Sequence, residues 1–475
     1  MKIDRDVLQR FVPLPPDVLA APRGLRDLLD DLGIEVKRVE GGVHTLELLA
    51  NRGDHHAYAG IAREISARFG SPLTLPETAE LQVVPGTAFR VESNLCLAYS
   101  LTGIAGAGGR LDEAQLAPLD AAGLGRNTAP VDATNLANLE LGQPTHAFDA
   151  DRIDGTIVVR ESVAGDKAWL LFTPESREIP AGTLVIADAS KILAIAGVIG
   201  CEDSKTTEHT TRIALESATF DPVAVRKASR ALGVHTDSAA RFERGSDPEA
   251  VIPGAARVVT LLESTGAWKR SGPTDHWRAP STPMPAIGLL GADVRDFLGL
   301  GLDIDDARIA AILEALGFSL EATSGGWWVT VPPRRTWDVT TRADLLEEIV
   351  RIIGYNEGPA TLPPVDLGAV PSDWELRRTR AEEVLLGLGF YEVITDGFHA
   401  RILSERLGLP DGHPLTRHVG TTNALDRGYS LLKNSGLPQA IEAVASNVRV
   451  RTLEVKLYEW TRAFHPRAPD AAERD

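Results

Sequence analysis

Residues 131–149 read VDATNLANLELGQPTHAFD and combine three leucines with a dense set of hydrogen-bonding side chains. Thr134 and Asn135 are adjacent, and Gly142 precedes a Gln-Pro-Thr-His run that ends at His146. We expect an apolar support under a polar, proline-rigidified loop with the histidine at its tip. Such loops are common in binding and catalytic sites. The alternative is a turn whose histidine caps a helix or fills a niche in the core.

The chain on either side of this stretch predicts an α+β protein of several domains, because 475 residues exceed the usual size of one domain. Strand-like runs punctuated by glycine alternate with helical patterns, and Asp221-Pro222 is a typical helix start. The expected units are an N-terminal domain (1–86), a mixed α/β module (87–267), a linker rich in Pro, Ser and Thr (268–285), a small α+β domain (286–362) and a further domain (371–475).

The composition excludes several classes of protein. The hydrophobic content of 43% is ordinary for a globular chain. No run of about 18 apolar residues occurs, so we expect no membrane span. Two cysteines, Cys96 and Cys201, indicate a reducing cytoplasm rather than a disulfide framework. A net charge of -17 repels nucleic acid at long range, so any RNA contact requires a local basic patch or a partner.

Two groups of charged residues lie on predicted helices. In the helix expected over 57–69, Ile61 and Ile65 face inward while Arg63 and Glu64 face solvent. A basic set could contact nucleic-acid phosphates, or could pair with nearby acids such as Asp237 and Glu243. This set comprises Arg226, Lys227, Arg230, Arg241 and Arg244.

Glu216 is a candidate binding residue because it lies in a strand-like run of apolar and small residues, Ile213 to Ser217. A carboxylate in such a place must be paired or must bind something polar. One interpretation is therefore a buried ion pair with Arg226, Arg230 or Arg241. The other is a polar contact to a ligand, in a site where glycines such as Gly197 and Gly200 let the backbone approach closely.

A second candidate site is acidic. Asp338 precedes a predicted helix on which Asp344, Glu347 and Glu348 share one face, and this set suits a hard divalent cation. The alternative is a solvated helix start whose carboxylates are complemented by Arg351.

An ordered series of motifs resembles the β subunit of bacterial phenylalanine–tRNA ligase over nearly the whole chain. Residues 286–357 resemble the B5 domain of this subunit, which implies a small winged-helix-like fold. Residues 374–398 resemble the start of its class II synthetase-like domain, which implies part of an antiparallel sheet. The strings that resemble its B3/B4 editing module are VDATN (131–135), ELGQPTHAFD (140–149), AGVIG (196–200), LESATFDP (215–222) and RFERG (241–245). Those that resemble its first domain are VPLPPDVLA (12–20), GIEVKRVE (33–40) and NRGDHHAYAGIARE (51–64).

The resemblance implies partners, cofactors and site residues. It implies an α₂β₂ assembly in which the α subunit uses ATP to attach phenylalanine to tRNA(Phe), and this chain alone binds no ATP. It implies that Thr134, Asn135 and His146 surround the ester of a mischarged aminoacyl-tRNA and its water, while Gly200, Glu216, Thr236 and Ser238 line the amino-acid pocket. Glu216 would accept the hydroxyl of tyrosine. Asp338, Asp344, Glu347 and Glu348 match a Mg²⁺ site shared with the α subunit.

The sequence also departs from the family pattern. Cys201 and Ser238 stand where the family has glycine and alanine, and Cys201 is either a nucleophile or a small buried residue whose acidic neighbours raise its thiol pKa. We expect a reduced form without the OB-fold insertion and the C-terminal anticodon-binding module, and therefore weakened tRNA binding. The alternatives are a stand-alone paralogue, which hydrolyses an aminoacyl ester or binds an aromatic amino acid, and a non-catalytic scaffold.

Overall fold

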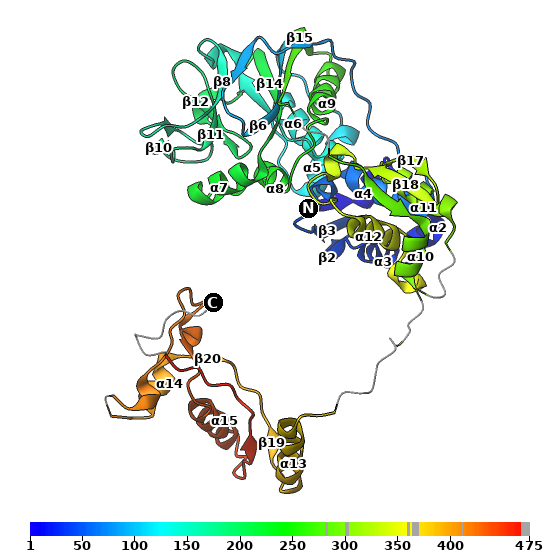
Figure 1. Cartoon of the computed structure of the whole chain (residues 1–475). Helices are drawn as coiled ribbons and strands as arrows, with labels where there is room; N and C mark the ends of the chain where they lie inside the picture. The colour runs from blue at the N-terminus through cyan, green and yellow to red at the C-terminus, as the bar shows by residue number, and fades with distance from the viewer. Residues whose placement is uncertain (281–283, 300–303, 359–361, 363–369, 411, 467–475) are drawn as a thin grey trace. The chain divides into compact units, whose positions relative to one another are not determined.

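The computed structural model describes residues 1–280, 284–299, 304–358, 362, 370–410 and 412–466. The chain forms two compact units, Met1–Thr361 and Leu362–Asp475 (Figure 1). Both units contain helices and strands, which confirms the α+β class. Among the described residues, no helix is long and apolar enough to cross a bilayer.

The first unit begins with a three-stranded antiparallel sheet of order β1-β3-β2 beside helix α4. The hydroxyl of Tyr58 on α4 accepts a hydrogen bond from the backbone N–H of Asp4 at 2.8 Å. Ile61 and Ile65 are fully buried, as expected, but the expectation that Glu64 faces solvent is wrong, because it is only 1% exposed. The elements are β1 (Lys2–Asp4), α1 (Arg5–Leu8), α2 (Pro16–Ala20), α3 (Gly24–Asp31), β2 (Glu35–Glu40), β3 (Val43–Glu47), η1 (Gly53–His56) and α4 (Tyr58–Phe69).

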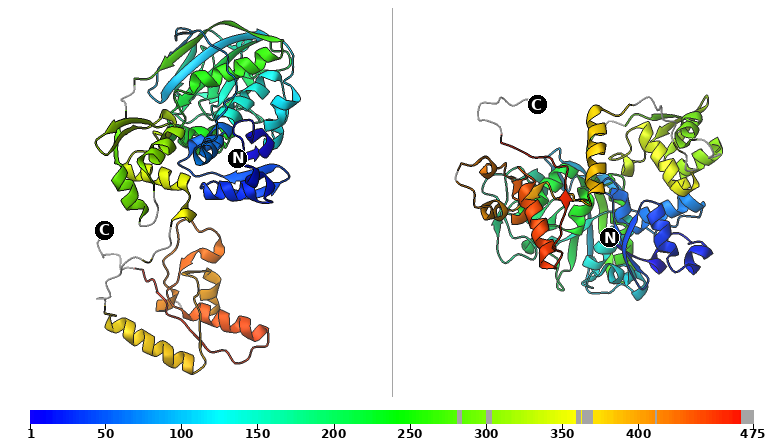
Figure 2. Two further views of the ribbon diagram at one scale, coloured as in Figure 1. Left: turned by 90° about the vertical axis from the view of Figure 1, so that its right-hand side faces the viewer. Right: turned by 90° about the horizontal axis from the view of Figure 1, so that it is seen from below.

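Two five-stranded sheets form the central module. One has the order β4-β15-β6-β14-β7 and the other β13-β12-β11-β8-β5. Helix α9 packs on the first sheet, and α6 packs on α9 (Figures 1 and 2). The strands are β4 (Val83–Pro85), β5 (Phe89–Val91), β6 (Cys96–Gly106), β7 (Thr145–Asp149), β8 (Ile157–Glu161), β11 (Leu184–Ala187), β12 (Ile192–Ile195), β13 (Ile199–Gly200), β14 (Arg212–Phe220) and β15 (Trp268–Arg278). The helices are α5 (Glu113–Ala122), α6 (Ala129–Leu141), α7 (Pro222–Leu232), α8 (Asp237–Phe242) and α9 (Val251–Ser264), and a two-stranded ribbon joins β9 (Lys167–Ala168) to β10 (Arg177–Glu178).

The polar loop expected over residues 131–149 is instead a helix followed by a strand. Helix α6 ends at Gly142, whose φ of 77° is a left-handed conformation that favours glycine, and β7 starts at Thr145. Most of α6 is buried, including polar Asp132, Asn138 and Glu140. A helix buried on most sides has no polar face opposite an apolar one, so the usual amphipathic period is missing from the sequence.

The prediction of a linker over residues 268–285 is wrong for most of that segment. Residues Trp268–Arg278 form β15, which pairs antiparallel with β6 and parallel with β4. The register shifts between Arg270 and Thr274, and this irregularity accommodates Pro273, which has no N–H for the ladder. The hydroxyls of Thr274 and Thr102 then meet at 2.9 Å across the strands. Residues 281–283 of the expected linker lie outside the described part.

The last part of the first unit is a three-stranded antiparallel sheet, β16-β18-β17, with three helices. Helix α12 begins with a capping box in which Thr341 and Asp344 bond each other's backbone N–H. Helix α4 of the N-terminal part packs on α11 and α12, and both parts share one apolar core. The elements are β16 (Ile287–Leu290), α10 (Gly291–Leu298), α11 (Asp306–Ala315), β17 (Ser319–Thr323), β18 (Gly326–Thr330), η4 (Pro333–Arg335) and α12 (Arg342–Ile353).

In the described part of the second unit, two separate two-stranded sheets stand in place of the expected antiparallel sheet. Strand β19 pairs parallel with β22, and β20 pairs antiparallel with β21. Helix α13 buries none of its side chains, although it carries Trp374, Leu376, Val384 and Leu386. The described elements are α13 (Asp373–Gly387), β19 (Tyr391–Glu392), β20 (Phe398–His399), α14 (Arg401–Arg406), β21 (Leu431–Leu432), α15 (Leu437–Arg449) and β22 (Leu457–Tyr458).

Candidate functional site

A cavity of about 240 Å³ lies where β7, β14, the β12–β13 turn and the start of α8 meet. Six of the seven residues predicted for the ester and amino-acid site line it: Asn135, His146, Gly200, Glu216, Thr236 and Ser238. The structure therefore brings together residues that are as much as 103 positions apart in the sequence.

The pairing of β7 with β14 places His146 and Glu216 side by side. The two residues are direct antiparallel partners, so their side chains leave the same face of the sheet. A Cβ on Gly254 of α9 would lie 3.4 Å from the Ser217 hydroxyl, so Ser217 faces the helix layer. Side chains alternate along a strand, so Glu216 points to the opposite face, where the cavity lies.

Glu216 is buried without a cationic partner. The expected ion pair with Arg226, Arg230 or Arg241 does not form, since none of these residues lies within ion-pair distance of it among the described residues. Burial raises the pKa of the Glu216 carboxyl to about 8, and the nearby Tyr99 hydroxyl partly opposes the rise. Glu216 Oε2 and the Tyr99 hydroxyl are both buried without a hydrogen bond of ordinary geometry. An uncharged carboxyl with an unused oxygen can bond a polar ligand.

His146, the strand partner of Glu216, is neutral. Burial lowers the pKa of His146 to about 4, and Nε2 is inaccessible to solvent and has no hydrogen-bond partner in the described structure. The ring packs edge-on against Phe148, with centroids 4.6 Å apart. A Cβ on Gly200 would lie 2.6 Å from Cε1 of His146, so only glycine leaves room for this ring. A neutral imidazole can orient a water or accept its proton.

The start of α8 closes the cavity. Thr236 is the N-cap of α8, and its hydroxyl accepts a hydrogen bond from the N–H of Ala239 at 3.0 Å. The same hydroxyl donates to the carbonyl of Val198 at 2.7 Å, which ties α8 to the β12–β13 turn. Thr236 therefore fixes two walls relative to each other, while Ser238 adds a half-buried hydroxyl to the lining.

Two residues singled out in the sequence do not reach the cavity. Thr134 points into its own helix and donates to the carbonyl of Val131 at 2.8 Å. Cys201 is fully buried in the apolar core between the sheets. Burial, then Asp203 and Glu202, raise the pKa of the Cys201 thiol to about 12, so it is a packed residue and not a nucleophile.

Sequence reasoning missed three contributors to the cavity wall. Thr145 has a buried hydroxyl without a partner, although it lies within the quoted stretch. Phe172 is 93% exposed at the cavity edge with a φ of 64°, which is unusual for a residue with a side chain. Leu171 beside it lies 3.2 Å from a Cβ placed on Gly200. The Leu171-Phe172 pair has no motif that could have marked it.

The four predicted metal ligands line a second cavity, but two of them, Asp338 and Glu348, form ion pairs with arginines. Asp338, Asp344, Glu347 and Glu348 line it together with Arg52, Arg335 and Arg351. Arg335 binds both oxygens of Glu348 at 2.8 and 2.9 Å and Asp338 at 2.9 Å, and Arg351 binds Glu348 at 2.6 Å. Asp344 caps α12, and only Glu347 is exposed. The set as arranged does not fit Mg²⁺, because a cation would have to displace guanidinium groups from Asp338 and Glu348.

The same arginines satisfy another acidic group. The ligand atoms of Asp54, His55 and Glu64 lie within 4.8 Å of one another, as in a metal site. Arg52 binds Asp54 at 2.8 Å and also Glu64, and Arg351 binds Glu64 at 2.5 Å. Burial favours the neutral form of Glu64, but Arg351 and Arg52 outweigh it and hold the pKa of Glu64 well below its usual value. This group is therefore a buried ion-pair network.

Three family models match parts of the chain: the B3/4 domain over residues 113–267, the tRNA synthetase B5 domain over 292–355, and the phenylalanyl-tRNA synthetase beta chain CLM domain over 359–475. The chain is 35% identical to the phenylalanine–tRNA ligase beta subunit of Xanthomonas campestris over 99% of its own length and 58% of that protein. It is 34% identical to the protein of the same name from Geobacter metallireducens and 35% identical to that from Moorella thermoacetica, over 96% of this chain and 56% of each relative. The chain thus spans a little more than half the length of these relatives.

Replacing Glu216 with glutamine should change how stability depends on pH. The folded protein holds the Glu216 proton more tightly than the unfolded chain does, so this group lowers the free energy of unfolding as the pH rises from about 4.5 to about 8. We expect Glu216→Gln to match the unsubstituted protein at pH 5 and to exceed it by on the order of 4 kcal/mol at pH 9. Urea denaturation at both pH values measures the difference, and exposed Glu208→Gln is the control. A difference that does not depend on pH would contradict the raised pKa.

Replacing Arg335 with glutamine should destabilise the first unit, because Glu348 and Asp338 would lose their main partner inside the protein. We expect the free energy of unfolding to fall by about 3 kcal/mol, and Glu348→Gln in the same chain to restore part of it. Exposed Arg308→Gln should change it by less than about 0.5 kcal/mol. Equal effects of the two arginine substitutions in chemical denaturation would rule out the network as a determinant of stability.

Proposed function

Because the chain belongs to the phenylalanine–tRNA ligase β-subunit family, we propose that it acts as a β subunit whose cavity at His146 and Glu216 hydrolyses tyrosine misattached to tRNA(Phe). One observation supports this most directly: Glu216 Oε2 and His146 Nε2, both buried and without a hydrogen-bond partner among the described residues, belong to side chains that line one cavity of about 240 Å³. Buried polar atoms without partners are rare in proteins, and here both lie where a ligand would supply the missing bonds.

Glu216 would select the amino acid. A hydroxyl on the ring of the bound amino acid can bond Glu216 Oε2, which otherwise stays unsatisfied. Phenylalanine lacks this hydroxyl and would leave the carboxyl buried without a partner. Sites built around such a bond reject the analogue that lacks the hydroxyl by about 10⁴-fold or more.

His146 would act at the ester. Its neutral Nε2 can accept a hydrogen bond from a water that attacks the ester carbonyl, and can take the proton as the new C–O bond forms. The bond to the tRNA ribose then breaks, the ribose oxygen takes a proton, and free tyrosine leaves. Since a pKa of about 4 makes His146 a weak base, orienting the water is its larger contribution. Asn135 lines the same cavity and would bond the ester or its water.

Hydrolysis of Tyr-tRNA(Phe) tests this proposal. We expect the full chain to release tyrosine, and Glu216→Ala and His146→Ala each to slow release by about 10²-fold, because each removes a polar contact to the reacting substrate. Glu208→Ala, an exposed change in the same module, should keep the full rate. Release of phenylalanine from Phe-tRNA(Phe) at the same rate would rule out selection by Glu216.

We propose that the second unit binds an α subunit. Helix α13 exposes Trp374, Leu376, Val384 and Leu386, and the two two-stranded sheets of this unit leave edges open among the described residues. Exposed apolar side chains on one helix are typical of an interface that a partner covers. Binding of tRNA(Phe), the use of ATP by the assembly, its α₂β₂ composition and a Mg²⁺ ion shared with the α subunit stay predictions.

Co-expression with the α subunit of the same genome tests this interface. The two chains should elute together, and Val384→Asp with Leu386→Asp should separate them, since a charge in an apolar contact is costly. Thr379→Asp, an exposed change on the same helix, should leave co-elution intact. Separate elution of two folded, unsubstituted chains would favour a stand-alone hydrolase instead, and Tyr-tRNA(Phe) hydrolysis by this chain alone would then be its activity.

A further inference from the structure

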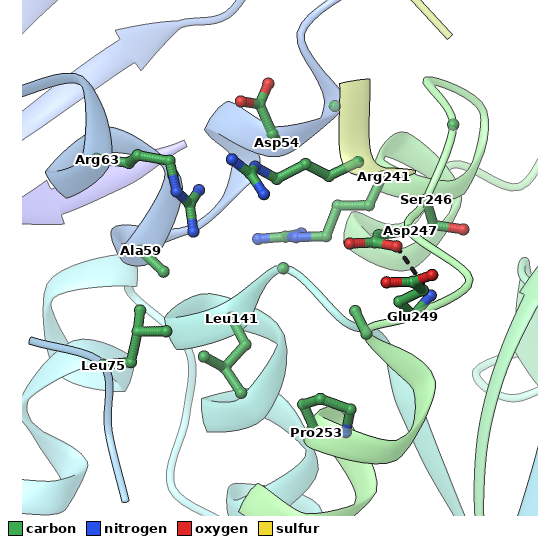
Figure 3. Close-up of a pocket in the computed structure, with 16 residues that line it drawn as sticks. Asp54, Ala59, Arg63, Leu75, Leu141, Arg241, Ser246, Asp247, Glu249 and Pro253 are labelled. Atoms are coloured by element: carbon green, nitrogen blue, oxygen red, sulfur yellow. Dashed lines mark hydrogen bonds between the residues drawn. The ribbon is translucent and has the colours of Figure 1, made fainter. Parts of the chain in front are cut away.

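A third cavity, of about 200 Å³, lies within the first unit, apart from His146 and Glu216. Three arginines line it from three separate elements: Arg63 of α4, Arg241 of α8 and Arg334 of η4. Figure 3 shows Arg63 and Arg241 reaching from opposite sides toward the same space, with Leu75, Leu141 and Pro253 below them. The cavity thus has a cationic side and an apolar floor.

None of the three arginines has a carboxylate within 4.0 Å among the described residues. The side chain of Arg63 makes no hydrogen bond to any described residue. Arg241 donates to the carbonyls of His56 at 3.0 Å and Asp237 at 2.9 Å. Arg334 donates to the carbonyl of Leu316, and its Nε is buried without an acceptor. Neutral carbonyls satisfy some of the N–H groups but do not balance the charge.

Two of the three carboxylates that line the cavity are bound elsewhere. Asp54 forms an ion pair with Arg52 at 2.8 Å, and Glu249 faces Arg278 at 3.4 Å. Asp247 accepts the N–H of Glu249 at 2.8 Å, and burial raises its pKa. Three guanidinium groups therefore share the cavity with one carboxylate that has no cationic partner.

Two neighbouring arginines are buried together with carboxylates that balance their charge. Arg335 and Arg351 are as buried as Arg241, whereas Arg63 and Arg334 are half-buried. The carboxylate partners of Arg335 and Arg351 raise their pKa above the usual value despite burial. Burial lowers the pKa of Arg241 and of Arg334 to about 10, and Arg63 contributes to the fall at Arg334 by repulsion. Buried positive charges without a counter-charge are costly and rare in proteins.

We propose that this cavity binds a phosphate group, either free phosphate or the phosphomonoester of a small organic molecule. Arginine matches phosphate oxygens with paired N–H donors, and three guanidiniums balance a dianion better than the single charge of a carboxylate. The apolar floor of Leu75, Leu141 and Pro253 would carry the organic part of an ester.

Calorimetric titration of the full chain with inorganic phosphate and with phenyl phosphate, against chloride at equal ionic strength, tests the site. Binding of both ligands is expected, and tighter binding of phenyl phosphate would identify an ester as the ligand, whereas equal affinity would identify free phosphate. Arg63→Gln should weaken both by about tenfold or more, because one charge-assisted contact is lost. Exposed Arg212→Gln, whose arginine pairs with Asp151, should leave the affinities unchanged.

A melting experiment separates ligand binding from a structural role. The Arg63 guanidinium has no hydrogen bond to lose, so in phosphate-free buffer Arg63→Gln should melt at or above the temperature of the unsubstituted protein. Phosphate should raise the melting temperature of the unsubstituted protein more than that of Arg63→Gln. A lower melting temperature of Arg63→Gln without phosphate would mean that this arginine stabilises the native state without an anion, which overturns the proposal. Equal affinity of Arg63→Gln and the unsubstituted chain for phosphate would overturn it as well.

Discussion

The first unit depends on one buried network of alternating charges. Glu64 of α4 lies at its centre and binds Arg52 and Arg351, and Arg351 continues to Glu348 and from there to Arg335. These residues come from both ends of the first unit's sequence, so the network joins the N-terminal part to α12 more specifically than apolar packing can. Apolar contacts tolerate small shifts of one helix along another, whereas bidentate ion pairs fix both position and orientation. Removing any member would leave a charge in the interior without its partner.

Buried ionisable groups occur in this chain in three states of charge and pairing, and these states distinguish the proposed functional regions from the structural ones. Glu64 is charged and fully paired. Glu216 and His146 avoid charge: burial moves the pKa of the first up and that of the second down, so both are largely neutral near pH 7. Arg63, Arg241 and Arg334 have no carboxylate within 4.0 Å among the described residues, although Asp54, Asp237 and Asp247 attract them from farther away. Ionisable groups with a structural role have hydrogen-bond or ion-pair partners inside the protein. Ionisable groups without such partners are the ones available to bind a ligand.

From the sequence, the residues that form the site were predicted more accurately than the helices and strands that carry them. Six of the seven residues that the resemblance to the β-subunit family implied for the site share the cavity. The helix α6 was missed because its polar residues are buried along with its leucines. Glu64 was expected in solvent because periodicity distinguishes apolar from polar residues but cannot reveal an arginine 287 positions away. The left-handed backbone of Phe172 and the acceptor-free Arg334 are also set by tertiary contacts, and no local pattern encodes them.

The position of strand β15 within its sheet determines which fragments of the central module keep that sheet complete. It lies between β4 and β6 in its sheet, so the module's sheet is completed by residues both before and after the segment 87–267. A recombinant fragment cut at those limits would lack two adjoining strands and would expose the whole hydrogen-bonding edge of β6 to water and to other molecules. Fragments that begin before Val83 and continue past Arg278 keep that edge covered and are the ones suited to crystallisation of the module alone.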